Sequence, residues 1–360
     1  MKRILFYIDS LRVGGAQRVM SNLICYFAEC GYEVLLVNDY IDLSSDIFSY
    51  SVPSSVKRLY LRNNLEGNKY IKNLERIIRL RNIVKTHNPD VMLSFLEKPN
   101  KRLILSTLGL KNKKIVSVRN DPFKEYGKSI IRKAIANIMY SFADGIVFQT
   151  EEAQDFFIKK IKRKSKIIMN PVSNIFFERT WLGLDKSIIT CGRLVKQKNH
   201  RLLINAFAQI ADQFSDYKLI IYGEGPLRDE LQKISNELGL HDRIILAGNC
   251  EGIPEILQKA ELFVLTSDYE GLPNALMEAL AVGVPCISTD CPCGGPKMLI
   301  QSGINGLLTK CGDEKMLAEK MRFILSNKEQ AKQLGDSARE LSKKYSPRII
   351  YKTWEEYIFK

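Results

Sequence analysis

The amino-acid sequence predicts an α/β protein made of two successive doubly wound domains, each built on a parallel sheet. Three observations lead to this prediction. The chain has 360 residues, which exceeds one ordinary core and suits two domains of about 150–200 residues. Short β-rich runs alternate with amphipathic helical stretches, a pattern typical of βαβ units. The alternation stops over residues 171–185 and then begins again.

The first domain is predicted over residues 1–170. Its parallel sheet is predicted to contain the strands Ile4–Ile8, Glu33–Asn38, Val91–Phe95, Lys114–Val118, Gly145–Gln149 and Lys166–Met169. Residues 171–185 are predicted to be a linker, because Asn-Pro, aromatic and glycine-containing sequence replaces the periodic pattern there.

The second domain is predicted over residues 186–345. Its strands are predicted at Ser187–Cys191, Lys218–Tyr222, Arg243–Ala247, Leu262–Thr266 and Val284–Ser288. After Gly306-Leu307-Leu308 the pattern predicts only helices, at Asp313–Leu325 and Lys328–Lys344. A last helix, Ser346–Tyr357, opens on Ser-Pro and carries Trp354. Residues 346–360 are therefore predicted to return to the first domain and bury this apolar surface there.

The positive charge is confined to the first half of the chain. The formal net charge is +14, and residues 1–170 carry all of it, with 30 Lys and Arg against 16 Asp and Glu. This half is expected to face phospholipid headgroups, a lipid diphosphate or nucleic acid, unless it is simply a basic soluble surface. The segment Lys128–Tyr140 mixes cations with apolar residues at helical spacing. It fits either a helix on a membrane surface or one packed on its sheet.

No segment reaches about 18 uninterrupted apolar residues, and the first apolar run is too short for a secretory signal. A cytoplasmic protein is therefore expected. Its eight cysteines are scattered, so no disulfide framework is expected. The spacing of Cys291-Pro-Cys293 does not suit a metal site, and none is predicted.

Glycines follow the first strand of each domain, where a helix is predicted to begin. Amides at Gly14-Gly15 lie at the positive end of a helix dipole and can approach a phosphate. The full G-x-G-x-x-G pattern is absent, which disfavours an NAD cofactor. In the second domain Gly192-Arg193 is followed by Lys198, and two fixed cations suit a diphosphate. The alternatives are a tight turn and two solvated cations.

Other strands of the second domain lead into glycine-containing loops. These loops lie at the rim where open parallel sheets bind ligands. Gly223, Gly248 and Gly294-Gly295-Pro296 mark them either as backbone cradles for a nucleobase, a sugar or an anion, or as ordinary turns.

The stretch Glu270-Gly271-Leu272-Pro273 leads into a helix predicted over Asn274–Ala281. Glu270 lies in the loop, whereas Glu278 lies more than one turn inside the helix among Ala, Leu and Met. A carboxylate with apolar neighbours needs a partner, and sugar hydroxyls are donors that carboxylates accept well. The neighbours of Glu278 argue against a surface position.

In this order and spacing, Gly14-Gly15, Gly192-Arg193 with Lys198, Glu270-x7-Glu278 and Gly294-Gly295-Pro296 resemble the retaining glycosyltransferases of family 4. The resemblance covers nearly the whole chain. It implies the GT-B fold, in which two Rossmann-like domains face a cleft and a C-terminal helix crosses back to the first domain. Bacterial enzymes of capsule, exopolysaccharide, lipopolysaccharide-core and lipid-linked oligosaccharide assembly are the most similar in pattern.

The resemblance implies a role for each motif residue. Glu278 would hold the donor ribose, and Glu270 would contact the transferred hexose with Gly271 and Leu272 beside it. Arg193 and Lys198 would bind the diphosphate and stabilise it as the leaving group. Further contacts to the donor are implied for Gly15, Gly192, Gly223, Gly248, Gly294 and Gly295.

Two departures from the family pattern stand out. Many relatives carry a histidine after the fourth strand of the first domain, whereas this chain reads Arg119-Asn120-Asp121 there. One of these residues would have to fill the acceptor-side role. The usual acid after Gly-Gly-Pro is replaced around Lys297-Met298.

The sequence therefore predicts a metal-independent, retaining glycosyltransferase. It would move a hexose or N-acetylhexosamine from a nucleotide diphosphate sugar, with UDP expected, to a saccharide acceptor that is expected to be lipid-linked. The setting would be bacterial surface polysaccharide synthesis, at the cytoplasmic face of the inner membrane, without a cofactor. One rival is a UDP-sugar epimerase or hydrolase of the same fold. The other is a basic nucleic-acid-binding protein, although no recognisable nucleic-acid module is present.

Overall fold

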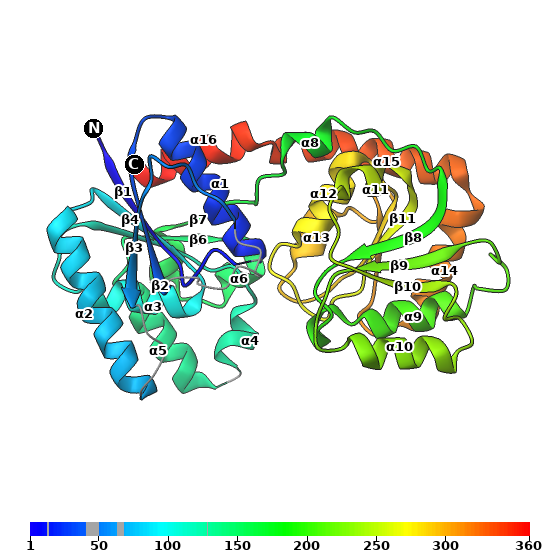
Figure 1. Cartoon of the computed structure of the whole chain (residues 1–360), viewed down its shortest axis with the longest axis horizontal. Helices are drawn as coiled ribbons and strands as arrows, with labels where there is room; N and C mark the ends of the chain where they lie inside the picture. The colour runs from blue at the N-terminus through cyan, green and yellow to red at the C-terminus, as the bar shows by residue number, and fades with distance from the viewer. Residues whose placement is uncertain (13, 41–49, 63–67, 128) are drawn as a thin grey trace. The chain divides into compact units, whose positions relative to one another are not determined.

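The computed structural model describes residues 1–12, 14–40, 50–62, 68–127 and 129–360. The chain divides into two compact units, residues 1–170 with 351–360, and residues 171–350 (Figure 1). Each unit is a parallel sheet covered by helices on both faces, which confirms the predicted fold class.

The sheet of the first unit has seven strands in the order β3-β2-β1-β4-β5-β6-β7, and neighbouring strands are parallel. The strands are β1 (Arg3–Tyr7), β2 (Glu33–Tyr40), β3 (Lys57–Arg62), β4 (Val91–Phe95), β5 (Lys113–Ser117), β6 (Gly145–Phe148) and β7 (Ser165–Ile167). Strand β3 is absent from the sequence-based prediction. It reads Lys-Arg-Leu-Tyr-Leu-Arg and lies at the sheet edge, where cationic side chains are common and the apolar signal is weak.

Helices cover both faces of this sheet. Figure 1 shows α1 (Gly15–Glu29) and α16 (Pro347–Phe359) on one side, and α2 (Lys69–His87), α3 (Glu97–Ser106), α4 (Pro122–Tyr126) and α5 (Ile130–Ser141) on the other. The short helices α6 (Glu151–Asp155) and α7 (Lys159–Lys162) connect β6 to β7. Apolar spacing explains the docking of α1, whose buried residues recur every three or four positions: Val19, Met20, Leu23, Ile24 and Phe27.

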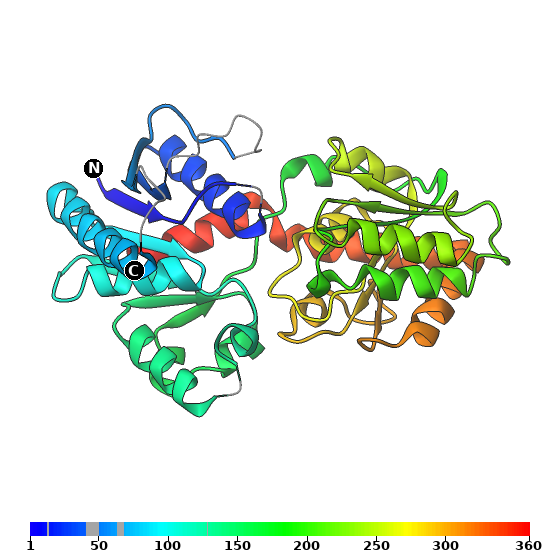
Figure 2. The same ribbon diagram turned by 60° about the horizontal axis from the view of Figure 1, so that its bottom comes forward.

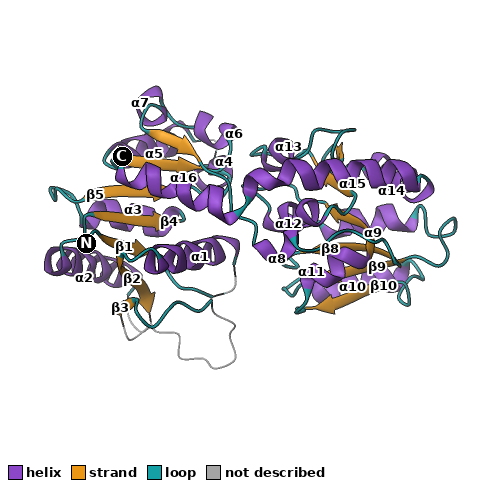
Figure 3. Ribbon diagram, turned by 90° about the horizontal axis from the view of Figure 1, so that it is seen from above, coloured by secondary structure: helices purple, strands orange, loops and turns teal. Residues whose placement is uncertain are grey.

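The C-terminal helix completes the core of the first unit, as predicted (Figure 2, Figure 3). Trp354 is fully buried, and its ring lies 5.6 Å from that of Phe95. Tyr357 Oη donates to the Lys164 carbonyl at 2.7 Å. The ring of Phe359 stacks on Tyr32 at 5.1 Å. These contacts tie residues 351–360 to the first unit.

The sheet of the second unit has six strands in the order β10-β9-β8-β11-β12-β13, again parallel. The strands are β8 (Asp185–Cys191), β9 (Lys218–Tyr222), β10 (Ile244–Gly248), β11 (Ala260–Leu265), β12 (Cys286–Thr289) and β13 (Leu307–Thr309). Strand β13 is absent from the sequence-based prediction, which places only helices after Leu308. It is three residues long, which is too short for a period-two pattern to reveal.

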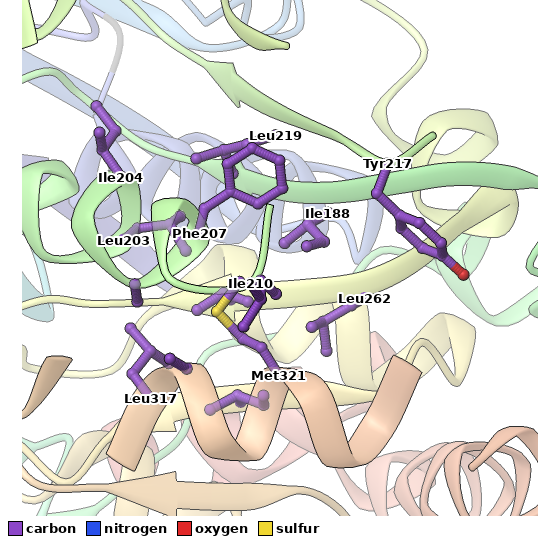
Figure 4. Close-up of a cluster of buried hydrophobic side chains, with 14 of the residues drawn as sticks. Ile188, Leu203, Ile204, Phe207, Ile210, Tyr217, Leu219, Leu262, Leu317 and Met321 are labelled. Atoms are coloured by element: carbon purple, nitrogen blue, oxygen red, sulfur yellow. The ribbon is translucent and has the colours of Figure 1, made fainter. Parts of the chain in front are cut away.

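In the second unit α9 contacts α10 and α14, and α12 contacts α8, α11 and α15, while α14 also contacts α15. Their bounds are α8 (Asn174–Phe177), α9 (His200–Ala208), α10 (Arg228–Glu237), α11 (Ile253–Lys259), α12 (Asn274–Val282), α13 (Gly295–Leu299), α14 (Glu314–Ser326) and α15 (Lys328–Ser342). Two 3₁₀ turns, η1 (Lys196–Lys198) and η2 (Lys343–Tyr345), precede α9 and α16. Figure 4 shows Phe207 of α9 and Met321 of α14 within one buried cluster with Leu219 of β9.

Helix α12 is almost wholly enclosed, with residues 276–282 all buried. It ends at Val282 and is followed by Gly283, whose φ of 88° favours glycine. A side chain there would also meet the Gly335 carbonyl of α15 at 3.1 Å. This enclosed helix carries Glu278.

Within the described ranges, no helix combines the length and the apolar character needed to cross a bilayer.

Candidate functional site

The predicted residues of the second unit gather at one edge of its sheet. Arg193 follows β8, Gly223 follows β9, Glu270 follows β11 and Gly294 follows β12. The strands are parallel, so all four residues stand at the carboxyl ends. Open parallel sheets bind their ligands along this edge.

Lys198 and Glu270 form an ion pair along this edge, with 2.5 Å between Nζ and Oε1. Their side chains are only 17% and 9% exposed. Ser267 Oγ donates to the same Oε1 at 2.7 Å, and Thr289 Oγ1 donates to the Ser267 carbonyl at 2.6 Å. No hydrogen bond to Glu270 Oε2 is seen among the described residues, which leaves that oxygen available to a ligand hydroxyl.

A short turn holds Lys198 in place. The turn η1 ends at Lys198, and the carbonyl of Lys198 accepts from Thr266 Oγ1 at 3.1 Å. Asn199 follows with a left-handed φ of 44° and donates from Nδ2 to Asp268 Oδ1 at 2.8 Å. A side chain at Gly192 would meet Lys198 Cε at 3.3 Å, so the lysine stem lies against that glycine. The loops after β8 and β11 are therefore joined.

Arg193 presents a free cation at the same edge. Its side chain is exposed, and its guanidinium makes no ion pair or hydrogen bond with the described residues. His200 Nε2 lies 3.2 Å from the Arg193 carbonyl. Burial lowers the pKa of His200 to about 4, so this histidine is neutral at pH 7. Because its guanidinium has no partner among the described residues, the planar, five-donor fork of Arg193 is available to an anion.

Glu278 is buried inside α12, with 7% of its surface exposed, as its apolar neighbours indicate. Burial first, and then the nearby Glu278 carboxylate, raises the pKa of the Cys191 thiol. Cys191 is the last residue of β8, so Glu278 lies near the carboxyl end of that strand.

Glycine is required where the loops after β8, β9 and β10 meet. Gly223 has a φ of 136°, and a side chain there would lie 2.1 Å from the Gly192 carbonyl oxygen. Gly223 N donates to the carbonyl of Gly248 at 2.8 Å. Gly248 itself has a φ of 75°. Close backbone packing therefore accounts for these glycines, and their contact with a ligand stays a prediction.

The loops after β11 and β12 also pack backbone to backbone. A side chain at Gly295 would lie 1.8 Å from the Gly271 carbonyl oxygen. Glu270 N donates to the Pro292 carbonyl at 2.8 Å, and Leu272 is 6% exposed. Gly294 precedes α13 with a φ of 77°. The position of Glu270 therefore depends on both loops.

In the first unit, Gly15 is the first residue of α1, and Gly14 precedes it with an extended backbone. The first amides of α1 thus lie just beyond the carboxyl end of β1, as the glycine pair predicts.

Arg119 lies under the C-terminal helix and is 8% exposed. Its guanidinium carbon is 4.0 Å from the centre of the Phe95 ring and 6.0 Å from that of Trp354. With the Gln149 amide turned to donate to the Arg119 carbonyl, its oxygen accepts from Arg119 Nη1 at 3.3 Å. Arg119 Nε and Nη2 are buried without an acceptor among the described residues. Burial lowers the pKa of Arg119 to about 9.

Asp121 and Asn120 differ in burial and in the hydrogen bonds that their side chains make within the protein. Asp121 is 1% exposed and caps α4, accepting at Oδ1 from Phe123 N at 2.8 Å. Burial raises the pKa of its carboxyl. Asn120 is half-buried, and its side chain makes no hydrogen bond with the described residues. Of the three predicted candidates, Asn120 is the one whose side chain has no structural role among the described residues and can contact a ligand.

The side chains that could bind a metal are scattered over the described parts of the chain. No three His, Cys, Asp or Glu side chains gather there closely enough to hold an ion. Cys291 and Cys293 are buried, and all eight cysteines are free thiols.

An open pocket of about 510 Å³ beside β13 is lined by Gln209 and residues 310–315, none of them a predicted site residue.

Sequence reasoning missed Ser267, which holds Glu270 from three positions upstream. Serine is common in loops, so the residue type alone carries no signal for this role. Lys297 and Met298 lie in α13, which follows the glycine pair.

Two helices of the first unit expose apolar stripes. Helix α5 buries Ala136 and Tyr140 but exposes a row of isoleucines, Ile130 (85%), Ile131 (72%), Ile135 (52%) and Ile138 (63%). Lys128 of the segment singled out in the sequence lies outside the described residues. Helix α2 exposes Tyr70 (84%), Ile71 (68%), Leu74 (59%) and Ile78 (51%), a stripe that the sequence analysis did not identify. Helix α3 contacts both α2 and α5.

Comparison with protein families covers nearly all of the chain. Residues 13–173 match Glycosyltransferase Family 4, and residues 173–341 match Glycosyl transferases group 1.

Two relatives from Campylobacter jejuni align over almost their full length. The GalNAc-alpha-(1->4)-GalNAc-alpha-(1->3)-diNAcBac-PP-undecaprenol alpha-1,4-N-acetyl-D-galactosaminyltransferase is 28% identical, covering 99% of this chain and 98% of that protein. The N-acetylgalactosamine-N,N'-diacetylbacillosaminyl-diphospho-undecaprenol 4-alpha-N-acetylgalactosaminyltransferase is 26% identical, covering 96% of each.

Solved structures share the fold at lower identity. Sucrose-phosphate synthase from Thermosynechococcus elongatus superposes with a TM-score of 0.84 at 16% identity, covering 99% of this chain and 98% of that one. Anabaena HepE in complex with UDP gives a TM-score of 0.80 at 17% identity, covering 99% of each chain.

Proposed function

This chain belongs to glycosyltransferase family 4 and the glycosyl transferases of group 1, and we propose that it transfers a hexose or N-acetylhexosamine from a UDP-sugar to a saccharide acceptor with retention of configuration. The observation that carries the proposal is the group of Arg193, Lys198, Glu270 and Glu278 at the carboxyl ends of β8 and β11. Two cations and two buried carboxylates match the parts of a nucleotide diphosphate sugar.

The cations serve the diphosphate. Lysine has three N–H donors, and the pair with Glu270 uses one of those of Lys198, so two remain for phosphate oxygens. Arg193 adds a bidentate fork that nothing in the described chain neutralises. Gly15, Gly192, Gly294 and Gly295 supply backbone contacts to phosphate and sugar in this proposal. These contacts stabilise the charge that appears on the diphosphate without calling on a metal ion.

The carboxylates serve the neutral parts of the donor. Glu278 accepts hydrogen bonds from the ribose hydroxyls, with Gly223 and Gly248 beside the base. Glu270 Oε2 accepts from a hydroxyl of the transferred sugar, with Gly271 and Leu272 alongside. Ser267 and Lys198 hold the other oxygen of Glu270 and so orient the carboxylate.

In the reaction we propose, the bond between the anomeric carbon and the diphosphate oxygen breaks, and its electron pair stays on the diphosphate. The acceptor hydroxyl forms the new bond on the same face of the sugar. Its proton passes to the leaving phosphate oxygen. This route depends on electrostatic stabilisation by Arg193 and Lys198 more than on a strong protein base.

On the acceptor side, Arg119, Asn120 and Asp121 are the candidates for contact with the incoming saccharide. Asn120 is favoured, because Arg119 is covered by Phe95 and Trp354 and Asp121 caps a helix. Its amide can both donate to and accept from a sugar hydroxyl.

We further propose that the acceptor is lipid-linked and is met at the cytoplasmic face of the inner membrane. The two Campylobacter relatives are named for undecaprenol-linked acceptors. The exposed isoleucines of α5 and the stripe on α2 suit the boundary between headgroups and acyl chains. The excess positive charge of residues 1–170 would attract anionic lipids.

A donor panel tests the proposal. UDP-, GDP- and ADP-sugars are added to the whole protein, and the donor that raises its melting temperature identifies the nucleotide. Release of UDP is then followed with and without saccharide acceptors. Faster release with an acceptor, together with a glycosylated product, supports transfer. Equal release of free sugar in both conditions would indicate a hydrolase or epimerase instead.

A further inference from the structure

The first unit contains a pocket that none of the motif residues lines. Its volume is about 330 Å³, at the small end of the roughly 300–1,000 Å³ range of small-molecule sites. Its walls come from α3, α4 and α5, which Figure 1 shows on the same side of the first sheet. The polar lining residues are Glu97, Lys101, Glu125, Tyr126 and Arg132.

The pocket lies at the functional edge of the sheet. Glu97 is the first residue of α3, directly after β4, and Glu125 belongs to α4, which follows β5. Asn120, the favoured acceptor-side candidate, is in the loop that joins β5 to α4. The pocket therefore stands where the first unit would receive a ligand.

Most of the polar groups in the pocket are already paired. Lys101 forms an ion pair with Glu97, and its Nζ also lies 4.9 Å above the Tyr126 ring. The other contacts of Tyr126 are a stacked Phe156 ring at 5.6 Å and a hydrogen bond to Tyr140 Oη at 3.2 Å. Tyr126 is 4% exposed, so it serves as a wall and not as a stacking platform.

Two of the five polar groups have no partner among the described residues, namely the exposed guanidinium of Arg132 and the carboxyl of Glu125. The side chain of Glu125, unlike that of Arg132, is partly buried. Burial raises the pKa of Glu125 to about 7, with the Glu97 carboxylate adding to the rise and Lys101 opposing it. An unpartnered carboxyl in such a place is unfavourable for the fold, and perturbed groups of this kind cluster at functional sites.

The charges select the class of ligand. Glu97 and Glu125 balance Lys101 and Arg132 in formal charge, so the pocket has no excess positive charge to attract the diphosphate of the donor. A neutral ligand with several hydroxyls suits it, because hydroxyls donate to Glu125 and accept from Arg132. Ile135 adds an apolar wall against which the C–H face of a ring can pack.

We propose that this pocket binds a sugar ring of the acceptor, with the Glu125 carboxylate accepting hydrogen bonds from its hydroxyls. This inference rests on the proposed transferase function and names a binding residue for its acceptor.

The variant Glu125→Gln tests this role. It keeps the shape of the side chain and removes the charge. The probes are methyl glycosides of glucose, galactose and their 2-acetamido derivatives, whose binding to the whole protein is followed by saturation-transfer NMR with UDP present. We expect the acceptor KM, or the Kd of the methyl glycoside, to rise about 10-fold or more, the range for loss of a charged hydrogen bond. The UDP-induced rise in melting temperature should be unchanged.

Glu29→Gln is the matched control, because Glu29 is an exposed glutamate of the same unit at the end of α1. It should alter neither measurement. Glu125→Asp, which keeps the charge but withdraws it by one methylene, should lose most of the same affinity.

Unchanged acceptor binding in Glu125→Gln would overturn the inference, as would failure of every methyl glycoside to bind a wild-type protein that still responds to UDP. A wild-type protein that responds to no nucleotide would instead overturn the proposed transferase function. The two failures are therefore distinguishable.

Discussion

Lys198 and Glu270 stand 72 residues apart in the chain and form an ion pair of 2.5 Å. The pair joins the loop that would hold the diphosphate to the loop that would hold the sugar. Both side chains are largely withdrawn from solvent, so neither charge is screened as a surface pair would be. Each side chain therefore depends on the other to balance its buried charge. The effects of this pair on stability and on turnover can be measured separately.

Lys198→Met should lower transfer at least 100-fold, because the diphosphate loses a cation as it leaves. It should also lower the free energy of unfolding by about 1–3 kcal/mol, because the Glu270 carboxylate then keeps only Ser267 as a partner. The double variant Lys198→Met with Glu270→Gln should regain most of that stability without regaining turnover. Urea unfolding and UDP release measure the two effects. Recovery of turnover in the double variant would contradict the leaving-group role.

Arg193→Ala should reduce transfer by 100-fold or more and leave the melting temperature within about 1 °C, since exposed side chains without partners contribute little to stability. Lys196→Ala is the control, because Lys196 is an exposed cation of the same short turn. Its turnover should match that of the wild type. If both variants lost turnover equally, Arg193 would act only through the positive charge of the loop and not through a specific contact with the diphosphate.

Asn120→Ala should raise the acceptor KM or lower kcat at least 10-fold. Arg119→Met should have a smaller effect on transfer. It should raise the melting temperature at pH 7. Burial lowers the pKa of Arg119 to about 9, so below that pH the folded protein contains a buried charge that destabilises it, and methionine removes this charge. Methionine keeps apolar contact with Phe95 and Trp354. A raised melting temperature shows that the variant is folded. Loss of transfer in such a variant would indicate that Arg119, and not Asn120, contacts the acceptor.

The stability of the protein should respond to the titration of Glu125. Its pKa rises from 4.5 to about 7 on folding, so its stabilising contribution is complete below pH 4.5 and is lost as the pH rises towards 7. Glu125→Gln does not titrate, so its melting temperature relative to wild type should be several degrees higher at pH 8 than at pH 5. The charged or titratable groups around Glu125 are Glu97, Lys101, Asp121, Tyr126, Arg132 and Tyr140. A difference independent of pH would show that Glu125 does not titrate in this range.

The protein should sediment with phosphatidylglycerol vesicles and much less with phosphatidylcholine vesicles, and added salt should release it. Ile131→Ser combined with Ile138→Ser should weaken this binding about 10-fold or more, because each isoleucine contributes roughly 1–2 kcal/mol when it leaves water. Leu184→Ser, which changes a 65% exposed residue of the second unit, is the control. Retention on DNA but not on vesicles would favour the nucleic-acid rival.

Most of the fold follows from sequence periodicity, because short β-rich runs separated by amphipathic helices leave few alternatives to parallel sheets. The exceptions have local causes. The edge strand β3 is half cationic, and β13 has three residues. Neither carries the apolar pattern on which prediction depends.

The site was less predictable than the fold. The burial of Glu278 follows from its neighbours in the helix, and the turn containing Gly192 follows from its glycine and cations. The attachment of Lys198 to Glu270 depends on how two loops pack, which local sequence does not encode. The same is true of Arg119, whose cover includes Trp354 from the far end of the chain, and of Glu125, whose surroundings come from three helices.

The dependence of the first unit on residues 351–360 has a consequence for how the protein is made. Residues 1–170 leave the ribosome before the second unit is synthesised, yet their core lacks Trp354 and Ile358 until translation reaches the final helix. At about 5–20 residues per second, this interval lasts roughly 10–40 seconds. During that time the apolar surface around Phe95 is open to the cell. We therefore expect the nascent first unit to bind chaperones until the last helix is complete.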